Sequence, residues 1–145
     1  MEVRLGQIAE QRATRADVKD FAKRMDSDFT RWLNQWTGMS SRNGMAFQPG
    51  MGALHREKID RVQKASGANF DRVYMTTVIE NLESMLPYYQ NEGRSARSPQ
   101  VRRLVEDELP TLQQNLAQAK QVGGRVAATT TPNHDRNVSA KKPKK

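Results

Sequence analysis

The stretch that decides the fold class is VKDFAKRMDSDFTRWLNQW, residues 18–36. Its large apolar residues recur every three or four positions, which places them on one face of an α-helix. They are Val18, Ala22, Met25, Phe29, Trp32 and Trp36. The opposite face is polar and consists of Asp20, Lys23, Arg24, Ser27, Arg31 and Asn34. An amphipathic helix is therefore predicted to run to about Trp36.

The segments on either side of this helix are shorter and less regular. Val3, Leu5, Ile8 and Ala9 indicate a short helix that begins at Met1. Thr14, followed three residues later by Asp17, predicts a capping box at the start of the long helix. Residues 37–52, TGMSSRNGMAFQPGMG, are rich in glycine and serine and are predicted to form a loop.

Three further helices follow this loop. The first is short, is marked by Leu54, Ile59 and Val62, and ends near Ser66 and Gly67. The second starts at about Asn69 and has a kink or an end at Pro87, because proline removes an amide donor. Its inner face is formed by Phe70, Tyr74, Val78, Leu82, Met85 and Tyr89.

The last helix starts at Ser98 and Pro99, since serine caps well and proline fits the first helical turn. Pro110 is expected to kink it, and Gly123 with Gly124 is expected to end it. Its apolar positions are Val101, Val105, Leu109, Leu112, Leu116 and Ala119.

These elements predict an all-α protein, because no segment shows the alternation of a strand. Four substantial helices and one minor helix are typical of a four-helix bundle. We predict a helical bundle domain over residues 1–122 and a disordered basic tail over residues 123–145. The net charge is +8, and the tail holds six basic residues against one acidic residue, so the bundle itself is only mildly basic.

Composition excludes several classes of protein. The chain has no cysteine, so neither a disulfide nor a zinc-thiolate site can form. It also lacks the run of about 18 apolar residues that a membrane span requires. The first residues, MEVRLGQIAE, do not have the pattern of a signal peptide, and none is expected. No glycine-rich phosphate loop and no triad-like set of Ser, His and Asp is present, which disfavours an enzyme.

Three separated blocks resemble the domain of unknown function 4142 family of bacterial ferritin-like helical proteins. The blocks are VRLGQIAEQRATRADVKDFAKRM, SGANFDRVYMTTVIENLE and SPQVRRLVEDELPTLQQNLAQAK. They fall in order over roughly residues 2–120. The resemblance implies a ferritin-like up-down bundle of the periplasm or cell envelope, with a stress-related role. Family members have a longer first helix after an export signal, so the resemblance also implies that either Met1 is not the true start or half of the first helix is missing here.

The same resemblance indicates which inward positions of this chain differ from the usual residues of the family. Family members carry Asp-His pairs on the second and fourth helices and a histidine on the last helix. The matching positions here are Asp28 with Phe29, Asn81 with Leu82, and Asn115. The stretch VIENLESML, residues 78–86, thus has a leucine where the resemblance places an imidazole. His55 alone is retained, and a transition metal needs three or four converging ligands. We therefore expect no metal site and no cofactor.

Other candidate ligands have simpler interpretations. Met39, Met45 and Met51 are soft enough to bind Cu(I), but methionines in such a loop are more often gap fillers. Trp32 and Trp36 are interpreted as packing residues. Carboxylates are numerous, at Glu80, Glu83, Glu106, Asp107 and Glu108. No Glu-x-x-His motif accompanies them, so di-iron chemistry of the ferritin type is disfavoured.

Three functions follow from these observations. The first is a non-catalytic helical bundle of the cell envelope that acts through an unknown protein partner or through weak self-association. A truncated first helix would leave an apolar groove for that purpose. The second is binding of nucleic acid or an anionic surface through Lys141, Lys142, Lys144 and Lys145, although no aromatic residue is interleaved for base stacking. The third is a ferritin-like metal-dependent oxidase.

Overall fold

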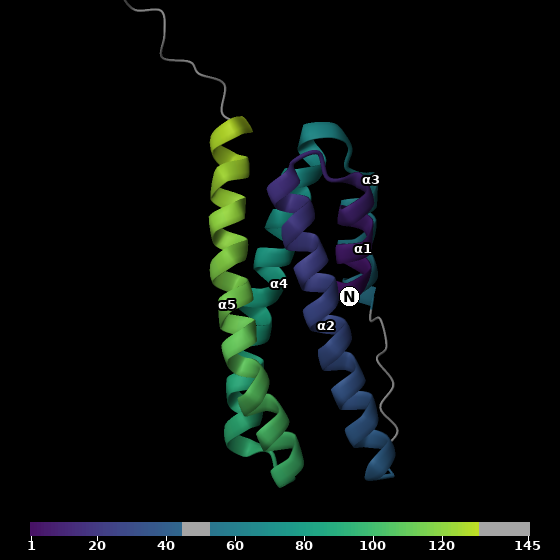
Figure 1. The fold of residues 1–145 in the computed structure, drawn as a ribbon, viewed down its shortest axis with the longest axis vertical. Helices are drawn as coiled ribbons and strands as arrows, with labels where there is room; N and C mark the ends of the chain where they lie inside the picture. Colours follow the sequence, from purple (N-terminus) through teal and green to yellow (C-terminus); the bar gives the residue numbers. More distant parts are fainter. Residues whose placement is uncertain (45–52, 131–145) are drawn as a thin grey trace, which may run out of the picture.

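The computed structural model describes residues 1–44 and 53–130, and every regular element in these ranges is an α-helix. The helices are α1 (Glu2–Arg12), α2 (Ala16–Arg42), α3 (Ala53–Lys64), α4 (Gly67–Ser95) and α5 (Pro99–Thr130). Figure 1 shows them packed lengthwise against one another. The predicted all-α helical bundle is confirmed.

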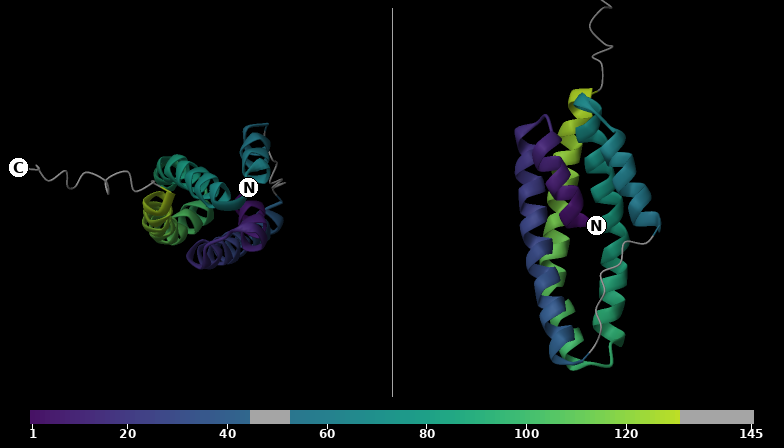
Figure 2. Two further views of the ribbon diagram at one scale, coloured as in Figure 1. Left: turned by 90° about the horizontal axis from the view of Figure 1, so that it is seen from above. Right: turned by 90° about the vertical axis from the view of Figure 1, so that its right-hand side faces the viewer.

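The two short helices both lie in the same half of the bundle. α1 and α3 have 11 and 12 residues, whereas α2, α4 and α5 have 27, 29 and 32. Figure 2 shows α1 and α3 beside the first part of α2 and the first part of α4, near the end where α5 finishes. The other half of the described bundle therefore consists of α2, α4 and α5 without a short helix beside them.

This asymmetry changes the burial along one helix face. The apolar residues of α2 that lie beside α1, which are Val18, Ala22 and Met25, are fully buried. The next residues of the same stripe, Phe29, Trp32 and Trp36, are only partly buried. The predicted polar face of α2 is exposed throughout. The apolar stripe thus continues beyond the point where α1 covers it.

The hydrophobic core joins all five helices in the half that contains α1 and α3. Its largest fully buried side chains include Leu5, Met25, Phe70, Tyr74 and Leu82. Gly6 lets α1 approach α2 closely, because a Cβ atom there would lie 3.1 Å from the carbonyl oxygen of Ala22. Apolar burial on this scale is the main favourable term in folding.

The start of α2 is capped differently from the prediction. Asp71 of α4 is buried, and its carboxylate accepts hydrogen bonds from the amide nitrogens of Thr14 and Arg15, both at 2.9 Å. It also accepts one from the Thr14 hydroxyl at 2.7 Å. Asp17 instead pairs with Arg15 at 3.0 Å. The predicted capping box of Thr14 and Asp17 is therefore wrong, since the carboxylate of a distant helix takes the same donors.

The predicted end of α2 at about Trp36 is also wrong. α2 continues six residues past Trp36 to Arg42, because Met39 and Ser40 are buried and favour the helical turn. Residues 45–52 of the predicted loop lie outside the described residues. α4 does not end at Pro87 but continues to Ser95, and α5 continues through Pro110, so a kink at either proline stays a prediction. The predicted start of α5 at Pro99 is confirmed, with the Ser98 hydroxyl accepting from the Val101 amide.

α5 does not end at Gly123 and Gly124 but continues to Thr130. Gly123 packs against α4, where a Cβ atom would lie 2.9 Å from the Cδ1 atom of Ile79. Val126 is buried, and Arg125 reaches Asp17 at 3.4 Å. Tertiary contacts thus offset the low helix propensity of two glycines. Residues 131–145, which include the four lysines of the predicted tail, lie outside the described residues.

Candidate functional site

The three positions that the family resemblance assigns to histidine come from three helices. Phe29 is on α2, Leu82 is on α4 and Asn115 is on α5. Leu82 is completely buried within the hydrophobic core, and Phe29 packs against the edge of that core. Asn115 is 2 % exposed. Phe29 and Asn115 line one small cavity, whereas Leu82 is not among the residues that line it.

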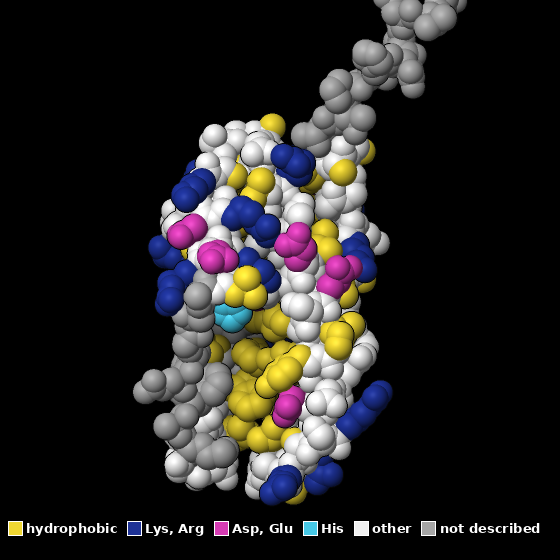
Figure 3. Space-filling view, turned by 180° about the vertical axis from the view of Figure 1, so that it is seen from behind, with side chains coloured by type: hydrophobic (Ala, Val, Ile, Leu, Met, Phe, Trp, Pro, Cys, Tyr) yellow, Lys and Arg dark blue, Asp and Glu magenta, His cyan; other side chains and the backbone are white. Residues whose placement is uncertain are grey.

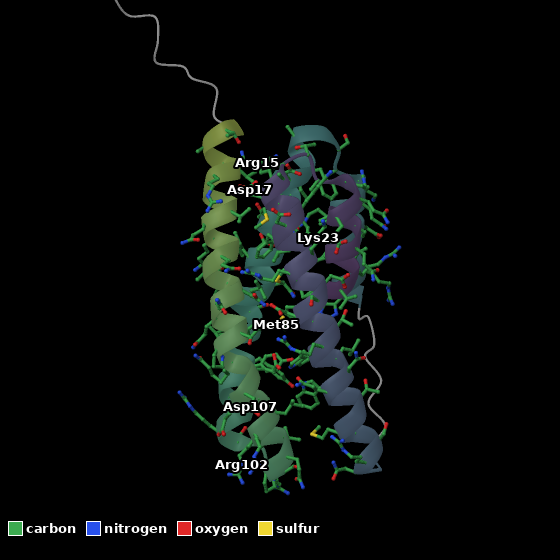
Figure 4. All side chains as sticks on the ribbon, viewed as in Figure 1. Arg15, Asp17, Lys23, Met85, Arg102 and Asp107 are labelled. Atoms are coloured by element: carbon green, nitrogen blue, oxygen red, sulfur yellow. The ribbon has the colours of Figure 1, made fainter. Side chains whose placement is uncertain are left out.

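The cavity lies between α2, α4 and α5 in the half of the bundle without α1 and α3. It has a volume of about 20 Å³, which is room for roughly one water molecule. Figure 4 shows side chains of these helices pointing toward one another between the levels of Met85 and Asp107. The lining residues are Asp28, Phe29, Trp32, Met85, Tyr89, Glu108, Thr111, Leu112 and Asn115.

The walls of the cavity are mainly apolar, and three aromatic rings form part of them. The ring centroid of Trp32 lies 6.2 Å from that of Phe29 and 5.6 Å from that of Tyr89, in both cases edge to face. Trp36 continues the series, with its ring centroid 5.6 Å from that of Trp32. Edge-to-face contacts of this kind hold the rings in defined orientations. Trp32 and Trp36 thus make the kind of packing contact that was predicted for them. Trp32 also lines the cavity.

Two carboxylates, Asp28 and Glu108, also line this cavity. Burial raises the pKa of the Glu108 carboxyl, while Arg31 lowers it and the negative charges of Asp28 and Asp107 add to the rise. Asp28 is paired with Arg31 at 3.4 Å, and the Arg31 side chain is 54 % exposed. A pair with one exposed partner and a separation of 3.4 Å contributes little attraction. The cavity edge therefore carries negative charge that its surroundings balance only weakly.

Asn81, the neighbour of Leu82, belongs to a separate buried network. Its amide nitrogen donates to the carboxylate of Glu2, and its amide oxygen accepts from Lys58 Nζ at 3.1 Å. Burial raises the pKa of Glu2 to about 7, although the positive amino terminus, Asn81 and Lys58 each lower it. The second carboxylate oxygen of Glu2 and the hydroxyl of Tyr74 have no hydrogen-bond partner among the described residues. Asn81 thus ties α1, α3 and α4 together.

The retained histidine does not join these positions. His55 is partly buried at the start of α3, and burial, followed by the positive charges of the amino terminus and Lys58, lowers its pKa. Within residues 1–44 and 53–130, no three His, Asp or Glu side chains lie close enough to hold a metal ion together. Met39 is buried on α2, and Met45 and Met51 lie outside the described residues.

The numerous carboxylates singled out in the sequence are dispersed. Glu80 pairs with Arg61 at 2.9 Å, and Glu83 pairs with Lys120 at the same distance. Glu106 and Asp107 are exposed on α5. Only Glu108 of this group lines the cavity. The other four residues therefore form surface ion pairs or face solvent, and the five together do not make a carboxylate cluster.

Sequence reasoning missed the buried acids Glu2 and Asp71. Both look like ordinary polar residues of amphipathic helices, and their partners lie far away in the chain, at Asn81 and at Thr14 with Arg15. The only available signal was the position of Asp71 one residue after Phe70, inside a block that the resemblance had already singled out. Nothing in the sequence marks Glu2.

Comparison with known proteins places most of the bundle in one family. The chain matches none of the curated proteins and none of the solved structures with which it was compared. No helix in the described part of the chain is long and apolar enough to cross a membrane. The family described as Domain of unknown function (DUF4142) matches residues 1–122, which are helices α1 to α4 and most of α5. The chain therefore belongs to the DUF4142 family.

Proposed function

We propose that this protein is a non-catalytic, ferritin-like helical bundle of the bacterial cell envelope. The observation that carries the proposal is the complete burial of Leu82 among core residues, at a position where the family resemblance implies an imidazole. A leucine offers no lone pair to a metal and no proton to a reaction. Packing thus takes the place of coordination at the centre of the bundle.

The neighbouring polar groups support the same conclusion. The side-chain amide of Asn81 is hydrogen-bonded to Glu2 and Lys58, so it is not directed toward Phe29 or Asn115. Asn115 presents one neutral amide to a cavity whose walls are mainly apolar. A catalytic metal site uses three protein ligands and an open position. Asp28 and Glu108 supply two carboxylates at most, and one of them is paired with Arg31.

Iron oxidation tests this proposal against the ferritin-like oxidase. The full chain is mixed with Fe²⁺ in air, and the appearance of Fe³⁺ is compared with that in protein-free buffer. We expect the two rates to agree. Faster oxidation that is lost in the Glu108→Gln variant would overturn the proposal and would favour the oxidase.

The location in the envelope and the stress-related role rest on the family resemblance. The test is cell fractionation of the natural gene product, expressed in its bacterial host from its own start site. Recovery with periplasmic or envelope markers is expected. Recovery with cytoplasmic markers alone would contradict this part of the proposal.

We further propose weak self-association through the face of the bundle on which Phe29, Trp32 and Trp36 of α2 are only partly buried. Figure 3 shows a hollow lined by hydrophobic side chains on one face of the molecule. The apolar stripe of α2 is only partly buried from Phe29 onward, and exposed apolar patches often mark interaction sites. Sedimentation equilibrium is expected to show a reversible dimer at high concentration. A clean monomer that binds no hydrophobic dye would remove this idea.

A further inference from the structure

One end of the bundle is strongly basic, and we call it the arginine end. It is formed by residues 39–44 and 93–105, where α2 and α4 finish and α5 begins. These residues include no acid and five arginines, which are Arg42, Arg94, Arg97, Arg102 and Arg103. Residues 1–122 together carry 18 basic and 15 acidic side chains, a net charge of +3. Since the arginine end alone carries +5, the rest of the bundle carries −2.

The five arginines are available to a partner. All of them are exposed. Within residues 1–44 and 53–130, none of their side chains takes part in an ion pair. Glu106 and Asp107, the next acids along α5, lie one helical turn beyond Arg102 and Arg103 and pair with neither. Figure 4 places Arg102 at the end of the bundle opposite Arg15 and Asp17.

Helix stability accounts for only two of these arginines. Arg42 and Arg94 lie in the last turns of α2 and α4, where the helix dipole favours a positive charge. Arg102 and Arg103 are instead the fourth and fifth residues of α5, near a helix start at which the dipole disfavours a cation. The first turn of α5 also has no acidic residue to balance them. Their placement therefore favours recognition of an anion over stabilisation of the fold.

A cleft joins two arginines from different helices. It has a volume of about 440 Å³ and lies between the end of α2 and the start of α5. Arg42 lines it from α2 and Arg103 from α5, and Asp107 is the acid among its lining residues. The guanidinium group matches the geometry of a phosphate, to which it can donate two parallel hydrogen bonds. The cleft thus has the size and the donors to receive a phosphate group.

The arrangement of the arginines favours a surface of phosphates over a nucleic acid. They come from α2, α4, α5 and the connection that holds Arg97, so they surround the end of the bundle and do not follow one helix face. Residues 39–44 and 93–105 contain no aromatic residue on which a base could stack. A membrane surface requires only clustered positive charge.

We propose that the arginine end docks the bundle end-on onto a membrane surface rich in anionic phospholipid. The guanidinium groups donate to headgroup phosphates, and one phosphate lies in the cleft between Arg42 and Arg103. The rest of the bundle, with its charge of −2, is repelled by the same surface, which fixes the orientation. The proposal depends neither on the envelope location nor on the absence of catalysis.

Co-sedimentation of the full chain with lipid vesicles tests the proposal. One set of vesicles contains equal parts of phosphatidylglycerol and phosphatidylcholine, and the other contains phosphatidylcholine alone. We expect binding to the anionic vesicles at low salt, and its loss at high salt because exposed charges are screened. Equal binding to both sets of vesicles, or no binding to the anionic set, would overturn the proposal.

A triple variant tests the arginines themselves. Arg97→Gln, Arg102→Gln and Arg103→Gln together should weaken binding on the order of a hundredfold, because each arginine near an anionic surface contributes about a factor of five. The urea midpoint should not fall, since these side chains stabilise no described contact. If the triple variant does not fold, Arg97→Gln alone, which lies outside any helix, should weaken binding about fivefold.

A matched control removes the same charge from exposed positions elsewhere. It combines Arg4→Gln, Lys23→Gln and Lys64→Gln. Binding should change only a few-fold, because charges farther from the surface than about 8 Å are largely screened at physiological salt. Equal losses in the two triple variants would show that only net charge matters and would overturn the proposal.

Two other outcomes assign the binding elsewhere. Exchange of Lys141, Lys142, Lys144 and Lys145 for Gln should leave most of the vesicle binding intact, and loss of binding there, with retention in the arginine variant, would overturn the proposal in favour of the tail. Duplex DNA of random sequence should bind more weakly than the anionic vesicles. Tighter binding to DNA that depends on Arg97, Arg102 and Arg103 would assign the arginine end to nucleic acid instead.

Discussion

The Leu82→Ala substitution tests the packing at the centre of the bundle. Leu82 is completely buried among the core residues of α4 and its neighbours. The change removes three carbon atoms from a closed interior, which at about 0.8 kcal/mol per buried CH₂ group costs roughly 2.4 kcal/mol. The cavity that remains adds to this loss, so the free energy of unfolding should fall by roughly 2 to 5 kcal/mol. Urea unfolding followed by far-ultraviolet circular dichroism measures the difference.

A matched control is available on α3. Leu54 is 62 % exposed, so Leu54→Ala removes the same atoms from a position that is already in contact with water. Its effect should stay within about 0.5 kcal/mol, as for most surface substitutions. If Leu82→Ala were as mild as Leu54→Ala, Leu82 would face solvent. The assignment of VIENLESML, residues 78–86, to the inner face of α4 would then be wrong.

Four further substitutions test individual positions. Gly6→Ala should destabilise the protein because its Cβ atom would lie 3.1 Å from the backbone oxygen of Ala22. Gly124→Ala is the control, because its Cβ atom would meet nothing within 4 Å, and it should stabilise the protein by about 0.5 to 1 kcal/mol. Thermal melts that rank these two variants the other way would contradict the close approach of α1 and α2. Asp71→Asn should lower the free energy of unfolding by roughly 1.5 to 3 kcal/mol because a charged acceptor of three hydrogen bonds is lost, and an unchanged urea midpoint would contradict the cap. The pKa of buried Glu2 is raised from 4.5 to about 7, so between these pH values the folded state binds more protons than the unfolded state does. The free energy of unfolding should therefore fall by on the order of 3 kcal/mol as the pH rises from 4.5 to about 7. Glu2→Gln should flatten that dependence, and urea midpoints measured at several pH values would show whether it does.

The helices and their inner faces were predictable because periodicity is a local property of the sequence. The stripe from Val18 to Trp36 needs only the geometry of one helix, and the structure places its first members in the core. The ends of the helices depend instead on distant contacts. α5 passes through Gly123 because Ile79 packs there and Val126 is buried beyond it, and neither contact is visible in the sequence of α5 itself.

The candidate site was predictable only in part. The resemblance identified Phe29, Leu82 and Asn115, but only the structure shows that Phe29 and Asn115 share a cavity and that Leu82 does not line it. Asn81 is another case, since its role depends on Glu2 and Lys58 on two other helices. Such pairings are set by how the helices pack, and a single sequence with no aligned relatives does not reveal them.

Metal analysis of the purified full chain tests most directly whether packing has replaced coordination at the centre of this bundle. The protein is prepared without an affinity tag, exposed to Zn²⁺, Fe²⁺ and Cu²⁺ in turn, dialysed, and analysed for bound metal. Phe29 and Leu82 provide no ligand atoms, and Asn115 provides a single neutral amide. We expect that no metal is retained in stoichiometric amount. Retention of one tightly held metal ion per chain would contradict it.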